Sequence, residues 1–312
     1  MADAGRKPSL GAWAWVFIVA LVAFELLAHA LIERAIPSDE SWERASAFVR
    51  AELQTSDIVV AAPPWIDPIV RHELGDLISL RRAAPADLGG VDRIWELATR
   101  GATTRSETPA LERDFDGVVV RMWPIDTPEV LYDFVEQVAA ASVDLVTDGD
   151  AHPCPWTRAA PDRGGLERGP MRPSERFVCD PRRPWLWVGP TVLADLELRP
   201  RRCIWQHPAG IEPVRTTFSE VPMGQSLVLH AGVDYQVARH RAHSPVTLSV
   251  WIDGELAGEL LHRDGDGWST LEIDTSARAG QHATVRFETT AVDPTARLFC
   301  YAASTQTGSD DE

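Results

Sequence analysis

The sequence predicts an α+β protein of several domains, with an N-terminal membrane helix, a small α/β domain and a C-terminal antiparallel β-sandwich. Three features of the chain lead to this prediction. An apolar segment occupies 10–32, helical periodicity alternates with short apolar runs over 38–148, and strand-like runs separated by turn signals fill 204–305. With 312 residues, the chain is long enough for two domains beside the apolar segment.

The segment 10–32 is predicted to export the chain. At about 1.5 Å per helical residue, it is long enough to cross a hydrocarbon core of roughly 30 Å. A basic N-terminus and an Ala-x-Ala pattern at 28–30 also fit a cleaved signal peptide. The first interpretation predicts a single-pass inner-membrane protein, with 1–9 as its cytoplasmic tail and its bulk in the periplasm. The second predicts a protein that is secreted after cleavage.

The charge balance excludes one class of partner. The net charge is −16, whereas binding to nucleic acid needs a basic surface that releases counterions, so we expect no nucleic-acid partner. We predict no cofactor either, because no Gly-rich phosphate loop follows the first predicted strand. The predicted partners are the membrane and an extracytoplasmic glycan or envelope protein.

The α/β domain is predicted over 38–148. Ser38 precedes an apolar pattern of helical spacing and is expected to cap a helix. Helices that alternate with short β-branched runs favour a mostly parallel sheet. The expected elements, in order, are a helix from Ser38, a strand at 58–61, a helix from Asp67, strands at 93–97 and 117–122, a helix over 128–141 and a strand at 143–146.

A connector rich in Pro, Gly and Arg is predicted over 149–203. A loop of that length is usually functional or disordered. Because Cys154 and Cys179 lie within it, we expect a disulfide to constrain this segment. A short strand at 185–188 is expected near its end. At the other end of the sandwich, the acidic residues 306–312 are predicted to form a disordered tail.

The sandwich is predicted over 204–305 from alternating apolar runs and turn signals. Asp253-Gly254 separates two such runs and is a signal for a two-residue hairpin. A second turn is predicted at Asp264-Gly265-Asp266-Gly267. Many short strands with no helix between them are typical of a β-sandwich.

The four cysteines predict disulfides, because the chain is expected to be exported. Three connectivities are possible, and we favour Cys154–Cys179 together with Cys203–Cys300. The second bond would tie the start of the sandwich to its last strand. A zinc site is less favoured, since no C-x-x-C pattern occurs.

Weak catalytic candidates occur in the α/β domain. Asp67 and His72 lie near predicted strand ends, where α/β folds bind ligands, and they have the chemistry of a general base and its orienting partner. Helix capping and solvation explain the same residues more simply. We therefore predict no catalytic residue, and the question of enzymatic activity stays open with a non-enzyme favoured.

Candidate ligand residues occur in the sandwich. Trp268 follows Asp264 and Asp266 directly, which places a flat aromatic ring beside hydrogen-bonding carboxylates, and Trp251 is a second candidate for stacking on a sugar. The two carboxylates are also a weak candidate for a Ca²⁺ site. The alternative for each tryptophan is core packing, and the alternative for the carboxylates is a hairpin turn.

Two stretches resemble known families. The sequence WERASAFVRAELQTSDIVVAAPPWIDPIVRHELGD, followed by DRIWELATRG, resembles the extracytoplasmic C-terminal region of polytopic glycosyltransferases that use lipid-linked sugars. The resemblance implies a fold and a compartment for this part of the chain. It does not imply transferase activity, because the catalytic acids of those enzymes lie between membrane helices that this chain lacks.

The second stretch, SVWIDGELAGELLHRDGDGWSTLEIDTS with HATVRFETTAVDPTARLFCYAA, resembles galactose-binding-like jelly-roll modules. That family binds glycans in many members, but no ligand residue carries over. The sequence thus favours a membrane-tethered, extracytoplasmic accessory protein that binds a glycan or an envelope partner without catalysis. The alternatives are an enzyme, or enzyme subunit, of envelope glycan assembly that uses an α/β cleft, and a purely structural interaction protein.

Overall fold

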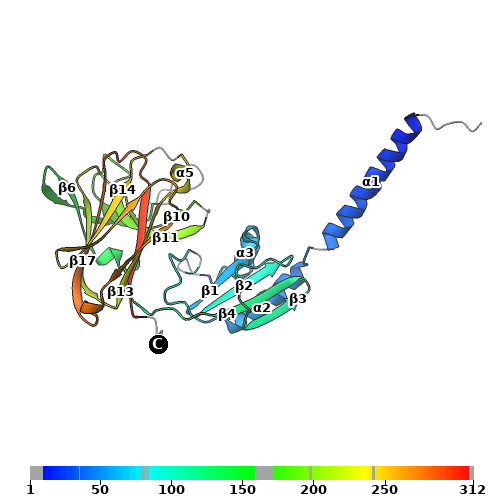
Figure 1. Cartoon of the computed structure of the whole chain (residues 1–312), viewed down its shortest axis with the longest axis horizontal. Coiled ribbons are helices and arrows are strands. Elements are labelled where there is room, and N and C mark those ends of the chain that lie inside the picture. The colour runs from blue at the N-terminus through cyan, green and yellow to red at the C-terminus, as the bar shows by residue number, and fades with distance from the viewer. Residues whose placement is uncertain are drawn as a thin grey trace, which may run out of the picture. The chain divides into compact units, whose positions relative to one another are not determined.

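The computed structural model describes residues 10–34, 36–78, 82, 84–158, 172–196, 199–240 and 243–308. The chain divides into two compact units, and it passes between them more than once (Figure 1). Unit 1 comprises Met1–Leu77 and Arg93–Pro124, and unit 2 comprises Ile78–Asp92 and Ile125–Glu312. The predicted boundary at 148 thus differs from the observed division, in which unit 2 begins at Ile125 and also takes an earlier segment.

The N-terminal helix α1 covers Leu10–Arg34. Among the described residues, no helix combines the length and the apolar character needed to span a membrane. The predicted membrane helix at 10–32 is therefore not supported, although a helix forms there. The predicted cytoplasmic tail, 1–9, lies outside the described residues.

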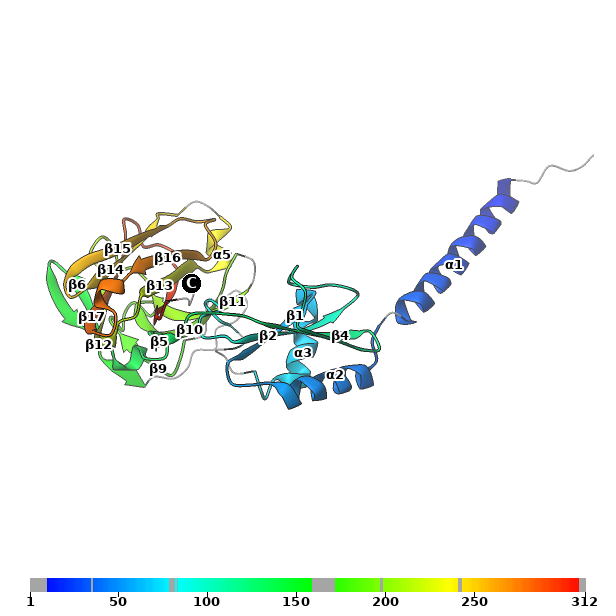
Figure 2. The same ribbon diagram turned by 60° about the horizontal axis from the view of Figure 1, so that its bottom comes forward.

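Unit 1 contains a four-stranded sheet with helices on one side. Its elements are α2 (Asp39–Glu52), β1 (Asp57–Ala62), the 3-10 turn η1 (Pro64–Ile66), α3 (Asp67–Leu74), β2 (Arg93–Thr99), β3 (Leu111–Phe115) and β4 (Val118–Pro124). Figure 2 shows α2 and α3 on the same side of the sheet. Ser38 caps α2 as predicted, because its Oγ accepts a hydrogen bond from Ser41 N.

The sheet of unit 1 is mixed. The strand order is β1-β2-β4-β3, in which β1 and β2 run parallel while β2–β4 and β3–β4 are antiparallel. The prediction of a mostly parallel sheet is therefore wrong. The reason is the turn at Asp116-Gly117, where both residues adopt positive φ and return β3 directly into β4 as a hairpin.

Buried ion pairs fix the strands of unit 1. Asp57 is fully buried, and its Oδ2 accepts hydrogen bonds from Arg93 Nη2 (2.7 Å) and Trp95 Nε1 (2.9 Å). Glu96 is also fully buried and accepts from Arg121 Nη1 at 2.9 Å and from Thr104 N at 2.5 Å. Each buried carboxylate is thus paired and hydrogen-bonded, as burial of a charge requires.

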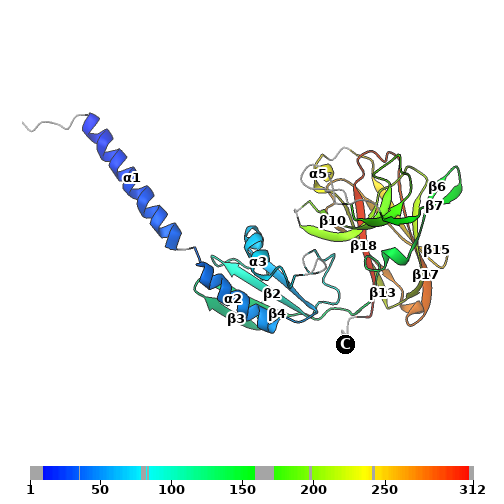
Figure 3. The ribbon, with the colours of Figure 1, turned by 180° about the vertical axis from the view of Figure 1, so that it is seen from behind.

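Unit 2 is a β-sandwich. One sheet has the order β16-β13-β18-β11-β10-β9-β8, with β5 also paired to β18, and the other has the order β15-β14-β17-β12-β6-β7. The strands are β5 (Val130–Asp133), β6 (Ser142–Thr147), β7 (Asp150–Pro153), β8 (Trp156–Arg158), β9 (Glu175–Val178), β10 (Trp187–Ala194), β11 (Pro200–Gln206), β12 (Val214–Pro222), β13 (Ser226–Val233), β14 (Val246–Ile252), β15 (Glu255–His262), β16 (Ser269–Asp274), β17 (His282–Ala291) and β18 (Phe299–Gln306). Figure 3 shows β18 running through the middle of this unit.

The core of unit 2 is rich in aromatic side chains and holds two disulfides. Phe134, Phe218 and Phe287 pack edge to face, with ring centroids 4.9 to 6.0 Å apart. The bonds Cys154–Cys179 and Cys203–Cys300 confirm the favoured connectivity. These disulfides indicate an oxidising, extracytoplasmic environment.

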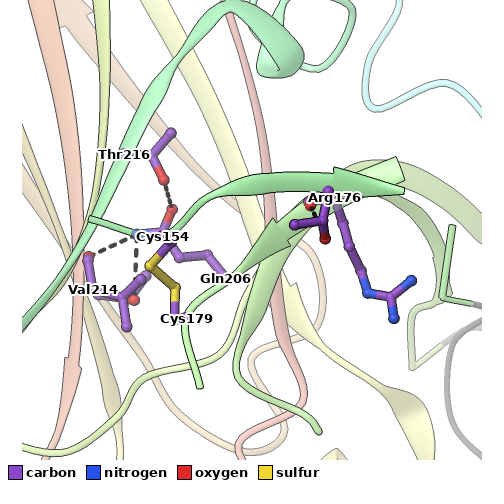
Figure 4. Close-up of a disulfide and its surroundings, with 8 residues drawn as sticks. Cys154, Arg176, Cys179, Gln206, Val214 and Thr216 are labelled. Atoms are coloured by element: carbon purple, nitrogen blue, oxygen red, sulfur yellow. Dashed lines mark hydrogen bonds between the residues drawn. A yellow bond between two sulfur atoms is a disulfide. The ribbon is translucent and has the colours of Figure 1, made fainter. Parts of the chain in front are cut away.

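A buried amide lies beside the first disulfide (Figure 4). Gln206 Nε2 donates to Val214 O at 2.9 Å, and Gln206 Oε1 accepts from Thr216 Oγ1 at 2.6 Å. Tyr301 also donates its hydroxyl proton to Gln206 Oε1, at 3.1 Å. The side chain therefore joins both sheets through hydrogen bonds that leave none of its polar atoms unpaired.

The structure corrects the prediction for 128–141 and for the residues that follow. Instead of a helix, this stretch forms β5 and the 3-10 turn η2 (Val138–Ala140), because Asp133 Oδ1 accepts from Val135 N and turns the chain after one short strand. The predicted strand at 143–146 exists as β6, but it pairs with β12 of the sandwich rather than with the sheet of unit 1.

The connector 149–203 and the tail 306–312 also differ from prediction. Strands β7 to β10 and the first half of β11 lie within the connector and complete the sandwich, so the sandwich extends well before 204. Most of the Gly- and Pro-rich part, 159–171, lies outside the described residues. Gln306 belongs to β18 and is buried, whereas 309–312 lie outside the described residues.

Candidate functional site

Asp264 lies in a buried ionic network. Its Oδ1 accepts a hydrogen bond from Arg297 Nη2 at 2.5 Å, and its Oδ2 lies 2.8 Å from His243 Nδ1. Burial alone would raise the pKa of Asp264, but hydrogen bonds from Arg297 and His243 lower it below its usual value. The carboxylate is thus held ionised as the counter-ion of a fully buried arginine.

Asp266 serves the turn that the sequence predicts. Its Oδ2 accepts from Arg263 N at 2.8 Å, and Gly265 and Gly267 adopt positive φ on either side. Among the described residues, no group of three or more metal-ligating side chains occurs at this turn or elsewhere. The two carboxylates of the weak Ca²⁺ candidate therefore have other tasks: Asp264 balances Arg297, and Asp266 closes the turn.

Trp268 is half-buried and contacted by its own chain. The guanidinium of Arg201 lies over its ring, 5.8 Å from the centroid, and its Nε1 donates to Ala86 O at 3.2 Å. A Cβ at Gly232 would come within 2.8 Å of the ring, so the indole packs directly on that backbone. A role for Trp268 in stacking on a ligand stays a prediction, because the structure shows contacts of the packing kind.

The contact to Ala86 belongs to residues 84–92, which we call the crossover segment. This stretch lies in unit 2, although the chain before and after it lies in unit 1. Arg202 N donates to Ala84 O at 2.8 Å, and His230 Nε2 lies 2.9 Å from Asp87 Oδ2. The crossover segment is thus held by backbone and side-chain contacts to β11 and β13.

Trp251 lies elsewhere, on the outward side of β14. Its ring is half-buried, and the guanidinium of Arg286 lies 4.8 Å from the ring centroid. On the neighbouring strand β15, its register partner is Leu256. Its Nε1 is buried and has no hydrogen-bond partner among the described residues. Trp251 lies on β14 of one sheet, whereas Trp268 directly precedes β16 of the other.

The weak catalytic candidates of unit 1 lie on α3. Asp67 Oδ2 accepts from Arg71 Nε at 2.5 Å, which is a pair at i, i+4 on the helix. His72 is exposed, and no hydrogen bond joins it to Asp67 among the contacts of the described residues. The structure therefore does not bring these two side chains together as an acid–base pair.

A cavity of about 780 Å³ opens at one end of the sandwich, and we call it the end-loop cavity. Its volume falls within the range of small-ligand sites. Four segments line it: 126–131 before and in β5, 222–225 between β12 and β13, 279–282 before β17, and 307–308 after β18. All four belong to unit 2.

The lining of the end-loop cavity combines free polar side chains with an apolar floor. No described residue forms a hydrogen bond or ion pair with the side chains of Asp126, Glu129, Gln225 or His282, and all four are exposed. The apolar members of the lining are Pro128, Leu131, Pro222, Met223 and Ala279. No local sequence pattern marks this site, because its residues come from segments that are far apart in the chain.

The backbone of the end-loop cavity is fixed, although the side chains of Asp126, Glu129, Gln225 and His282 are free. Glu129 and Thr307 exchange two hydrogen bonds of 3.0 Å, from Glu129 N to Thr307 Oγ1 and from Thr307 N to Glu129 O. Thr127 Oγ1 donates to Val91 O at 2.9 Å, and Gly280 N donates to Met223 O at 2.9 Å. These bonds connect the lining segments to the sandwich, so the polar groups project from a rigid frame.

Comparison with known proteins gives only distant structural likenesses. No family model and no curated protein matches the chain. A Clostridium perfringens ZmpB structure, of CBM51-2 in complex with GlcNAc and INT domains, has 13% identity and a TM-score of 0.32, and the match covers 68% of this chain and 40% of that one. The chain thus spans less than half the length of that structure.

Two further structures show how varied these likenesses are. The CBM51 of a Clostridium perfringens GH95 protein, in complex with methyl-galactose, has 12% identity and a TM-score of 0.27, over 38% of this chain and 79% of that one. The secreted serine protease VesC of Vibrio cholerae has 13% identity and a TM-score of 0.24, over 63% and 31%. TM-scores this low assign the chain to no family, and none of these three structures supports the resemblance of 42–101 to glycosyltransferases.

Proposed function

We propose that this chain is an extracytoplasmic, non-catalytic glycan-binding protein that holds a saccharide in the end-loop cavity of unit 2. One observation carries the proposal: a cavity of ligand size is lined by polar side chains that have no partner among the described residues. Elsewhere in unit 2 the sequence-predicted polar candidates are engaged, as Asp264 is with Arg297.

The chemistry of the lining suits a saccharide. Carboxylates and amides exchange hydrogen bonds with sugar hydroxyls, since the carboxylate accepts and the amide both donates and accepts. Leu131 and Pro222 supply an apolar surface on which the C–H face of a sugar ring can pack. Because the cavity is open and lacks an aromatic platform, we expect affinities between millimolar and micromolar, or roughly 4–8 kcal/mol.

The same lining argues against glycoside hydrolysis. A glycosidase keeps one of its two carboxyl groups protonated by placing it in a water-poor environment. Asp126 and Glu129 are both exposed to solvent, so neither has the environment of a catalytic acid. Binding without cleavage is therefore the function that the geometry supports best.

The test is titration calorimetry of the whole chain with neutral oligosaccharides. Gln225→Ala combined with Gln281→Ala should weaken binding about thirtyfold, because each of the two lost hydrogen bonds contributes about 1 kcal/mol. Gln236→Ala removes an amide outside the cavity and should bind like the wild type. Equal binding by the double variant would move the site elsewhere, and a loss on Trp251→Ala or Trp268→Ala would move it to those residues.

Two outcomes would reject the proposal itself. If no oligosaccharide binds at about 10 mM, a structural interaction with an envelope protein becomes the better account. If the oligosaccharide is cleaved during long incubation, and Glu129→Gln stops the cleavage, then the cavity is catalytic.

A further inference from the structure

The end-loop cavity carries a net negative charge in its lining. Asp126 and Glu129 contribute two carboxylates, and the lining contains neither Lys nor Arg. His282 is the one lining side chain able to carry positive charge, so a single imidazole stands against two carboxylates. No described cation forms an ion pair with either carboxylate, so nothing in the described structure compensates them.

The two carboxylates project from a backbone that is fixed on both sides. Ile125 N donates to Asp92 O at 2.8 Å and Thr127 Oγ1 to Val91 O at 2.9 Å, so hydrogen bonds flank Asp126 directly. Glu129 is held by its two bonds to Thr307, and Gly90 N donates to Pro128 O at 3.1 Å between them. A ligand that binds these two carboxylates therefore pays little conformational entropy for ordering the backbone that carries them.

We infer that the end-loop cavity prefers glycans that carry a protonated amine, such as hexosamines without their N-acetyl group, over neutral glycans, and excludes glycans that carry acid groups. This inference rests on the proposed function and names its ligand class. An ammonium group donates hydrogen bonds to a carboxylate in addition to the Coulomb attraction, whereas a uronic or sialic acid would meet two like charges. The N-acetyl form of the same sugar keeps the hydroxyls but loses the charge.

The expected size of the preference follows from the open position of the cavity. A pair of unit charges at about 4 Å in water interacts by about 1 kcal/mol, or roughly fivefold in affinity, and a second carboxylate at about twice that distance raises the preference to about tenfold. Salt screens charges that are exposed in this way, since the Debye length falls to about 3 Å at 1 M. The preference should therefore shrink at high salt while neutral binding persists.

The experiment compares three tetrasaccharides on the whole chain at pH 6.0: a glucosamine oligomer, its N-acetylated counterpart and an oligogalacturonate. We expect the glucosamine oligomer to bind about tenfold tighter than the N-acetylated one, and the oligogalacturonate not to bind. Asp126→Asn combined with Glu129→Gln should abolish the preference and retain binding of the N-acetylated oligomer, because both amides still accept hydrogen bonds.

A charge-matched control separates the cavity from the overall charge of −16. Asp150→Asn with Glu272→Gln removes two exposed carboxylates of unit 2 outside the cavity and should keep the preference. If both double variants lose it equally, the attraction is diffuse and the inference fails. If the two oligomers bind the wild type equally, the inference fails while the proposed function stands; if neither binds, both fail.

Discussion

The two units stabilise their interiors in different ways. Unit 1 places Asp57 and Glu96 inside and pairs each with an arginine, and its described part contains no cysteine. Unit 2 builds a continuous core from aromatic and aliphatic side chains and ties it with two disulfides. A small unit buries too little apolar surface for a large core, so paired polar groups take part in ordering its strands.

The two units also differ in where a ligand site can form. In unit 1 the catalytic candidate Asp67 lies on a helix surface and is paired locally with Arg71. In unit 2 the loops at the end of the sandwich project from strands fixed by a large core, and the end-loop cavity forms between them. In this chain, loops carried by a rigid frame, rather than any single motif, form the candidate site.

The largest effect is expected from truncating the chain to the sandwich that the sequence predicted, which tests whether that part folds by itself. A fragment of residues 204–308 lacks β5 to β10 and most of the crossover contacts, so both sheets lose strands from one edge. We expect this fragment to show no cooperative melt, whereas residues 36–308 fold. Circular dichroism with thermal melting makes the comparison, and a cooperative transition in the short fragment would show that its remaining strands suffice.

The second prediction compares how much each of the two disulfides of unit 2 contributes to the free energy of unfolding. The bond Cys203–Cys300 spans 97 residues and Cys154–Cys179 spans 25. In the chain-entropy model, a loop near 100 residues contributes about 4.7 kcal/mol and one of 15 about 3. Replacing Cys203 and Cys300 by Ala should therefore lower the free energy of unfolding by about 1 kcal/mol more than replacing the other pair. Urea denaturation measures both, and the reverse order would contradict the prediction.

A third prediction compares the buried ion pairs of the two units. Arg297→Met should lower the free energy of unfolding by about 3–5 kcal/mol, because it leaves Asp264 buried without its cation. Arg93→Met in unit 1 should cost less, since the side chain of Arg93 is 19% exposed and that of Arg297 is 0% exposed. Arg158→Met, which breaks an exposed pair with Glu175, should change stability by less than about 1 kcal/mol. Equal effects at all three positions would be evidence against a role for burial.

The last prediction concerns the pH dependence of stability. Burial, aided by the nearby charge of Arg297, lowers the pKa of His207 and His262 in unit 2 to about 4. In the unfolded chain both imidazoles titrate near pH 6.5, so the unfolded state binds more protons between pH 6.5 and 4. Stability is therefore complete above pH 6.5 and falls as the pH drops towards 4, by up to about 3 kcal/mol for each histidine.

Unit 1 supplies the internal control for this pH dependence. Its described part contains no buried histidine. Carboxylates whose pKa is lowered in the folded state, such as Asp57, lose their stabilising contribution only as the pH falls below their unfolded pKa of about 3.9. Hydrogen exchange at pH 7.0 and 4.5, corrected for intrinsic rates, should show loss of protection in unit 2 alone. Parallel loss in both units would mean that groups other than His207 and His262 dominate.

Local sequence patterns correctly predicted the strands in which apolar and polar residues alternate clearly. The strands of 204–305 and the hairpin at Asp253-Gly254 follow from alternation and turn chemistry, and both residues of that turn adopt positive φ as expected. The disulfide pairing followed from the expected sandwich. The stretch 128–141 was mispredicted because its apolar residues fit a helical spacing, while Phe134 and Val138 instead enter the sandwich core.

Contacts between distant segments explain the other differences. Arg297, the partner of Asp264, lies 33 residues away and was not singled out by any local pattern. The end-loop cavity joins Asp126 to Gln281 and Thr307, which only the folded topology brings together. The turns at 222–225 and 279–282 contain glycine and were the one available signal of loops at that end of the sandwich.

The position of β18 has a consequence for synthesis of the chain. This strand follows all of its sheet partners in the sequence, yet it lies between β13 on one side and β11 and β5 on the other. The ribosome therefore releases β5, β11 and β13 before β18. The edges of these strands that pair with β18 stay unpaired until β18 is made. Cys154 and Cys179 can meet early, whereas Cys203 must wait for Cys300 on β18. Sandwich closure and the second disulfide are thus a single event that follows the synthesis of β18, at which an oxidoreductase would act on an already assembled set of partner strands.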